Sequence, residues 1–175
     1  MPNVALSEHG RIEATALAQR LAQERITAII TSPMQRCRET AVLVAAAAGQ
    51  HPIISEGWNE VDFGAWTGQS FDALEGDPTW RDWNAERDTA TTSAGVSMPW
   101  IQKNVLAEIQ RVQDQHGGGR IVIVSHAELI KAVLSFYLGI PLTAYMRFDI
   151  DPACFSTLAL WCGGGKIMSL NQASW

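Results

Sequence analysis

Two short runs of β-branched residues, each followed at once by a helical pattern, constrain the fold of this chain more than any other feature. The runs are residues 26–31 (ITAIIT) and 120–125 (RIVIVS). Such runs are typical of strands that are buried on both faces. Helical patterns follow over residues 35–48 and 127–138, and a glycine comes directly after each. This alternation predicts an α/β fold of three layers, a mostly parallel sheet between helices.

Weaker patterns complete the expected framework. Good helix formers fill residues 14–21, with Ser7 as a plausible N-cap before them. We expect one more helix over residues 101–112, and short strands near residues 52–55, 145–150, 155–161 and 166–170.

Residues 58–100 differ in amino-acid composition from the rest of the chain. They hold five of the seven tryptophans, together with several glycines and a run of small polar residues. We interpret them as a cap-like excursion of loops and short helices within one domain that spans residues 1–175. Tryptophans at this density more often form a packed mini-core than a ligand cage, so we expect a mini-core.

Charge and cysteine content exclude several classes of function. A net charge of −5 disfavours a protein that grips nucleic acid or anionic lipid. The chain has three cysteines, Cys37, Cys154 and Cys162. Their number is odd and no two of them have a C-x-x-C spacing, which disfavours a disulfide framework or a zinc ribbon. No apolar stretch is long enough to cross a bilayer. We therefore expect a cytoplasmic protein with no metal, no cofactor, and no nucleic-acid or membrane partner.

Three side chains are candidates for chemistry on phosphate. Arg36 follows the first predicted strand and His126 follows the second, and the carboxyl ends of parallel strands meet at one edge of a sheet. A guanidinium offers a planar fork to two oxygens, and an imidazole can donate near neutral pH. Glu60 lies in an aromatic turn and suits a proton donor. Each residue also has a purely structural interpretation, as a hydrogen-bonding or ion-paired side chain.

Four segments resemble motifs of the histidine phosphatase superfamily, the phosphoglycerate-mutase-like enzymes. In chain order they are residues 6–11 (LSEHGR), 31–41 (TSPMQRCRETA), 60–68 (EVDFGAWTG) and 122–126 (VIVSH). Because their order and spacing agree with the family over nearly the whole chain, the resemblance implies the phosphoglycerate-mutase-like fold.

The resemblance also implies a chemistry. The family transfers a phosphoryl group in two steps through a histidine, which lies in an Arg-His-Gly motif at the end of its first strand. By resemblance, Arg36 binds phosphoryl oxygens, His126 is the second phosphate-binding and catalytic histidine, and Glu60 is the catalytic acid/base. The implied ligand is phosphate or a small phosphate ester.

The chain departs from the family at its start and at single positions. The first strand and its Arg-His-Gly motif are missing, and with them the nucleophile and a strand from the middle of the sheet. Val96, Asn104 and Ala127 stand where the family often has an acid, an arginine and a glycine. Residues 8–10 (EHG) hold a histidine-glycine pair, but the spacing to the next motif places His9 at a surface position.

Three hypotheses remain open from the sequence. The first is a histidine-phosphatase domain without its nucleophile, inactive or nearly so. The second is an active phosphomonoesterase whose gene start has been placed too late. The third is an anion-binding or dimerising module, because a missing inner strand leaves backbone groups that need partners. A homodimer, residues 3–6 or a rearranged sheet would then cover the gap.

Overall fold

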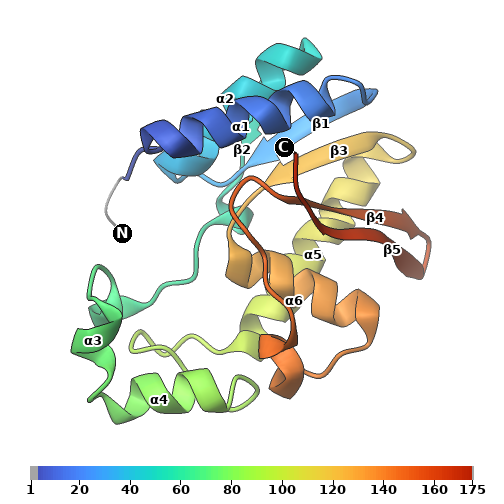
Figure 1. Cartoon of the computed structure of the whole chain (residues 1–175). Coiled ribbons are helices and arrows are strands. Elements are labelled where there is room, and N and C mark those ends of the chain that lie inside the picture. The colour runs from blue at the N-terminus through green and yellow to red at the C-terminus, as the bar shows by residue number, and fades with distance from the viewer. Residues whose placement is uncertain (1–3, 175) are drawn as a thin grey trace.

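A parallel sheet of three strands forms the centre of the computed structural model, which describes residues 4–174 (Figure 1). In spatial order the strands are β2 (Pro52–Ile54), β1 (Ile26–Thr31) and β3 (Arg120–Val124). β1 pairs in parallel with both neighbours and is buried at every position except Thr27. The two β-branched runs are therefore neighbouring strands of one sheet, as the sequence predicts.

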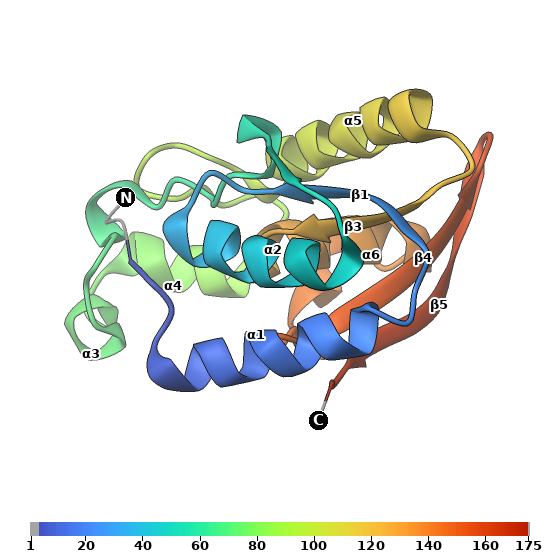
Figure 2. The same ribbon diagram turned by 90° about the horizontal axis from the view of Figure 1, so that it is seen from above.

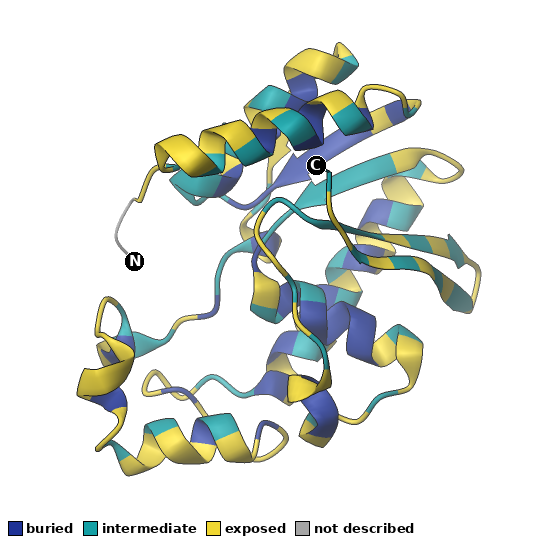
Figure 3. Cartoon of the chain, viewed as in Figure 1, coloured by how far each residue is buried: buried dark blue, intermediate teal, exposed yellow. Residues whose placement is uncertain are grey.

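Helices cover both faces of this sheet (Figures 2 and 3). They are α1 (Glu8–Leu21), α2 (Gln35–Ala48), α5 (Met98–His116) and α6 (Ala127–Leu138). Ile29 packs into one buried cluster with residues of α1 and α2, whereas its neighbour Ile30 packs into another with residues of α5 and α6. Since successive strand side chains point to opposite faces, α1 and α2 lie on one face and α5 and α6 on the other. The predicted α/β architecture is confirmed.

The helix ends follow from local chemistry. Ser7 is the N-cap of α1, and its Oγ accepts a hydrogen bond from Gly10 N at 3.1 Å. α2 and α6 stop at Gly49 and Gly139, which both have φ near 65° and so take the left-handed conformation that favours glycine. Among residues 4–174, none of the helices combines the length and apolarity that a bilayer crossing demands.

The sheet is interrupted beyond β3. The next strands, β4 (Phe155–Trp161) and β5 (Gly164–Gln172), form an antiparallel hairpin of their own, and within the described chain β3 pairs only with β1. Phe155 packs with the α1–α2 cluster and Leu158 with the α5–α6 cluster, so the hairpin contributes to the cores on both faces of the sheet. The side chains of residues 121–124 are only partly buried, in contrast to β1. Among the described residues, β3 therefore has a strand partner on one side only.

Two expectations near this interruption need correction. The strand predicted near residues 145–150 is wrong: residues Leu142–Arg147 form a 3₁₀ helix, η3. Tyr145 is buried there against α6, so a tertiary contact overrides its preference for a strand. Residues 4–7 form no strand over the gap, because Leu6 N donates instead to Glu39 Oε2 at 3.1 Å. Asn3, which was expected to help cover the gap, lies outside the described residues.

The tryptophan-rich excursion is a series of short helices whose apolar side chains pack into the α5–α6 cluster. The helices are η1 (Glu56–Trp58), η2 (Gly64–Trp66), α3 (Phe71–Leu74) and α4 (Pro78–Ala85). Trp58, Trp66 and Trp83 are buried in the α5–α6 cluster, whereas Trp100 is 60% exposed. Asp77 caps α4 and also accepts a hydrogen bond from Trp66 Nε1 at 2.8 Å. Core packing, rather than a ligand cage, is therefore confirmed for three of the five tryptophans, but they belong to the larger α5–α6 cluster and not to a mini-core of their own.

Gly64 fixes the start of this excursion, and its replacement tests that role. Its φ is 59°, and an added Cβ would lie 2.6 Å from Ser93 Oγ and 2.8 Å from the backbone nitrogen of Ala94. We expect Gly64→Ala to lower the free energy of unfolding by more than about 2 kcal/mol, since backbone strain and a clash add together. Gly68→Ala is the control, because φ is 80° but no atom lies within 4 Å, and about 1 kcal/mol is expected. Equal losses in urea denaturation would contradict this assignment.

Candidate functional site

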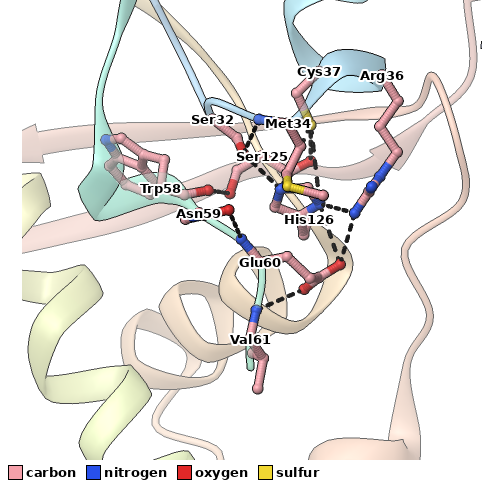
Figure 4. A network of polar contacts seen from close by, with 10 residues as sticks. All are labelled: Ser32, Met34, Arg36, Cys37, Trp58, Asn59, Glu60, Val61, Ser125 and His126. Carbon is pink, nitrogen blue, oxygen red and sulfur yellow. Dashed lines mark hydrogen bonds and ion pairs between the residues drawn. The ribbon is translucent and has the colours of Figure 1, made fainter. Parts of the chain in front are cut away.

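Three side chains meet beyond the carboxyl ends of β1 and β3 (Figure 4). Arg36 Nη2 lies 3.2 Å from Glu60 Oε2 and 3.0 Å from His126 Nδ1. Glu60 Oε2 is in turn 3.2 Å from His126 Nδ1. The first turn of α2, the loop after η1 and the N-cap position of α6 supply these residues. The structure thus brings together all three residues that the sequence singles out.

The three side chains differ in how far solvent reaches them. The His126 side chain is 3% exposed, Glu60 17% and Arg36 32%. The Glu60 carboxylate is also fixed by the backbone, because its Oε1 accepts a hydrogen bond from Val61 N at 3.0 Å. The imidazole and the carboxylate are therefore fixed, and the guanidinium is the group most free to turn toward a ligand.

Ser32 and Cys37 complete the surroundings of the imidazole, although the sequence did not single them out as site residues. Ser32 Oγ lies 2.7 Å from His126 Nε2 and accepts a hydrogen bond from Met34 N at 3.2 Å. Cys37 Sγ lies 3.7 Å from Nε2 and 3.9 Å from Nδ1. Ser32 follows directly after β1, which is the one signal that places it at the same edge as His126.

The Cys37 thiol is kept neutral by its surroundings. Burial raises its pKa to about 11, and the nearby Arg36 opposes this shift without cancelling it. A neutral, buried thiol is a poor nucleophile. Cys37 therefore acts as a packing group beside the imidazole.

Thiol reactivity tests this description. At about pH 8 we expect iodoacetamide to modify Cys162, which is exposed, and to leave Cys37 unmodified in the folded protein. Peptide mass spectrometry after denaturation, which opens Cys37 to the reagent, provides the internal control. Modification of both cysteines at similar rates in the folded state would contradict the burial and raised pKa of Cys37.

Two helix N-termini add positive potential to the same edge. α2 and α6 both begin here, and neither N-cap residue, Met34 or His126, gives a side-chain hydrogen bond to the first turn. The first N–H groups of a helix have no partner within the helix, and the helix dipole makes this end favourable for an anion. The N–H groups at these two helix ends therefore favour an anion at this edge, although the whole chain is acidic.

A second polar cluster ties the excursion to α6. Glu128, two positions after His126, pairs with Arg87 Nη1 at 3.1 Å and accepts a hydrogen bond from the Tyr145 hydroxyl. The Arg87 guanidinium lies 4.4 Å from the centre of the Trp83 ring. Burial, together with the adjacent Glu128 carboxylate, raises the pKa of Tyr145 above its usual range. These contacts hold residues 83–87 against the first turn of α6.

The other described histidines lie apart from this site. The His9 side chain is 80% exposed, and its Nε2 lies 3.2 Å from Glu13 Oε1 within α1, which agrees with the expected surface position. Within residues 4–174, no three side chains of His, Cys, Asp or Glu gather closely enough to hold a metal ion. His126 is accordingly the one histidine placed to meet a ligand in this part of the chain.

A parallel sheet between helices, with an arginine, a histidine and a glutamate at its carboxyl edge, defines an α/β protein of the phosphoglycerate-mutase-like class. The chain belongs to the histidine phosphatase superfamily (branch 1), whose sequence profile matches residues 1–173. The family resemblance that the sequence motifs indicated is therefore confirmed.

Individual relatives agree with this membership. Phosphoserine phosphatase 1 of Hydrogenobacter thermophilus is 29% identical over 168 residues, covering 95% of this chain and 80% of the relative. A bifunctional protein of Mycobacterium tuberculosis is 30% identical over 176 residues, covering 99% of this chain but only 48% of the relative. The crystal structure of Entamoeba histolytica phosphoserine phosphatase with 3-phosphoglyceric acid superposes with a TM-score of 0.88 at 26% identity, covering 98% and 86% of the two chains.

Proposed function

We propose that this chain binds phosphate or a small phosphate ester at Arg36, Glu60 and His126, and that it is inactive or nearly so in phosphoryl transfer by itself. The observation that carries the proposal is the convergence of Arg36 and His126 at two uncapped helix N-termini, with no second histidine beside them among residues 4–174. Arg36 offers its fork to two phosphoryl oxygens, His126 contributes a further hydrogen bond, and Glu60 suits a proton donor to a leaving oxygen.

The candidate nucleophiles at the site are all unsuited to attack phosphorus. His126 has contacts at both ring nitrogens and a side chain that is 3% exposed. Ser32 is fully buried, and the Cys37 thiol is buried and neutral. Since a covalent mechanism needs an accessible and activated nucleophile, binding without turnover is the behaviour that this arrangement supports.

Relatives support small phosphate esters as the ligand class. The Entamoeba phosphoserine phosphatase was solved with 3-phosphoglyceric acid, and a histidine-to-alanine mutant of it was solved with phosphoserine. The second structure indicates that this fold can hold phosphoserine when a histidine has been removed. We therefore propose phosphoserine and similar monoesters as first ligands to test here.

Turnover and binding are measured separately to test the proposal. With p-nitrophenyl phosphate we expect no turnover above that of His126→Ala, since loss of a covalent nucleophile in a serine protease costs on the order of 10⁶-fold in turnover. Calorimetric titration with millimolar inorganic phosphate is expected to show binding that His126→Ala weakens. Robust turnover that His126→Ala abolishes would overturn the proposed inactivity, and absence of any binding heat would overturn the proposed site.

The interrupted sheet favours a second candidate function, completion of this domain by another strand. In the part of the chain that the structure describes, β3 has no strand partner on the side away from β1, and the β4–β5 hairpin contributes to the cores on both faces of the sheet. Strand exchange within a homodimer would supply the missing hydrogen bonds. Light scattering at micromolar concentration is the test, and a monomer would contradict the dimer.

A completed domain would also have a different activity. If an apolar strand ending in Arg-His-Gly is encoded in frame upstream of Met1, the natural protein is proposed to be an active phosphomonoesterase that forms a phosphohistidine. The upstream nucleotide sequence tests this directly, and a stop codon close before Met1 would contradict it.

A further inference from the structure

Glu128 is a second carboxylate at the edge of the sheet where the anion site lies. It belongs to the first turn of α6, two positions after His126. Its Oε2 accepts hydrogen bonds from Arg87 Nη1 at 3.1 Å and from the Tyr145 hydroxyl. Among residues 4–174, its Oε1 has no hydrogen-bond partner, and it is not one of the fully buried atoms that lack one. Because the side chain is 21% exposed, this oxygen can accept a hydrogen bond from a ligand.

Neighbouring side chains hold the Glu128 carboxylate in place. The Arg87 side chain is 7% exposed, and its Nη2 donates to Asn84 Oδ1 at 3.1 Å. The Tyr145 side chain is buried, and its ring centre lies 5.1 Å from the Arg87 guanidinium. A ligand that reaches Oε1 would therefore meet a fixed acceptor, and little side-chain entropy would be lost on binding.

Glu128 and Glu60 lie near each other but differ in what they can still accept. Burial raises the pKa of Tyr145, the Glu128 carboxylate adds to this shift, and Glu60 makes a smaller contribution of the same sign. Glu60 is therefore close enough to act on the hydroxyl that Glu128 binds. Both oxygens of Glu60 have partners, since Oε2 pairs with Arg36 and Oε1 accepts a backbone N–H. A further donor on a ligand would find its acceptor at Glu128.

The free oxygen of Glu128 beside an anion site matches a ligand that carries both charges. A second negative group on the ligand would be repelled by the carboxylate, whereas a positive group would form a charge-assisted hydrogen bond with it. We infer that the site prefers phosphate monoesters that bear an ammonium group, and that Glu128 Oε1 accepts a hydrogen bond from this ammonium. Arg36 then faces the phosphoryl group of the same ligand. The inference rests on the proposed anion site and assigns the residue that recognises the other end of the ester.

Two esters of matched shape test this preference. O-Phosphoethanolamine and propyl phosphate differ in that the first has an ammonium where the second has a terminal methyl group. In calorimetric titrations at about pH 7.5, we expect the wild-type protein to bind phosphoethanolamine about tenfold more tightly, the effect of one hydrogen bond between charged groups. This comparison needs no variant, so it decides the matter even where a variant fails to fold. Equal affinities, with inorganic phosphate still bound, would overturn the inference and leave the proposed site intact.

Glu128→Gln assigns the preference to a residue. The amide oxygen can stay with Arg87 and Tyr145, which places an NH2 donor at the position of Oε1, so the affinity ratio of the two esters should fall to about one. Using the ratio cancels any general change in anion affinity. Glu13→Gln is the matched control, because the Glu13 side chain is 20% exposed and its Oε1 lies 3.2 Å from His9 Nε2 on α1. Its ratio should remain that of the wild type.

The remaining outcomes separate the inference from the site on which it rests. Circular dichroism shows whether Glu128→Gln is folded. A preference for phosphoethanolamine that persists in folded Glu128→Gln, or one that Glu13→Gln also removes, would overturn the role of Glu128. Absence of binding heat with inorganic phosphate and with both esters would overturn the proposed site and, with it, the inference.

Discussion

Alanine in place of Arg36 is expected to weaken phosphate binding by about 100-fold. Hydrogen bonds to a charged partner contribute about 1.5–3 kcal/mol each, and a guanidinium can give a phosphate two of them. The loss has a second cause, because Arg36 also neutralises Glu60 at 3.2 Å. Without the guanidinium, the carboxylate repels the incoming anion. Calorimetric titration with inorganic phosphate at about pH 7.5 measures the change in affinity.

Two variants show whether the effect belongs to the site. Arg38→Ala removes the same charge from an exposed position of the same helix, and we expect less than about a twofold change. Arg36→Lys keeps the charge but loses the planar fork, so its affinity should lie between wild type and Arg36→Ala. A larger loss in Arg38→Ala than in Arg36→Ala would place the anion elsewhere on α2.

The elements that the sequence predicted well are those in which local pattern and burial coincide. Residues 26–31 form β1 without any change of boundary, because the middle strand of a parallel sheet is buried on both faces. Tyr145 shows the opposite case. Its ring lies 4.4 Å from the Lys131 ammonium of α6 and its hydroxyl contacts Glu128, so it is held in a 3₁₀ turn. The sequence of residues 145–150 alone does not predict these contacts with α6.

The candidate site shows the same limit. Arg36 and His126 were predictable because the carboxyl ends of parallel strands meet at one edge. Ser32 and Cys37 were not singled out, since their importance depends on contact with His126, which lies 94 and 89 positions away from them. A buried serine and a buried cysteine look like ordinary core residues until the fold places an imidazole against them.

Alanine in place of Trp83 is expected to lower the free energy of unfolding by about 3–5 kcal/mol, the largest loss of stability predicted here. Trp83 is completely buried, with its ring edge-on to Phe63 at a centroid distance of 6.4 Å. Its face lies against the guanidinium of Arg87, whose side chain is 7% exposed. Arg87 Nε has no hydrogen-bond partner among the residues that the structure describes. Removal of the ring leaves a cavity beneath a buried charge, which increases the cost. Urea denaturation followed by circular dichroism measures the loss.

Trp100→Ala makes the same chemical change at the end of the same excursion, but Trp100 is 60% exposed, so a loss below about 1 kcal/mol is expected. Trp83→Phe is a second variant for the case that Trp83→Ala does not fold. Its loss in free energy of unfolding should be smaller than that of Trp83→Ala, because phenylalanine retains an aromatic face for Arg87. Since Arg87 pairs with Glu128 at the first turn of α6, both Trp83 variants should also weaken phosphate binding next to His126, whereas Trp100→Ala should not. Equal losses of stability in Trp83→Ala and Trp100→Ala would contradict the core position of Trp83. Unchanged phosphate affinity in a folded Trp83→Phe would show that the excursion does not support the site.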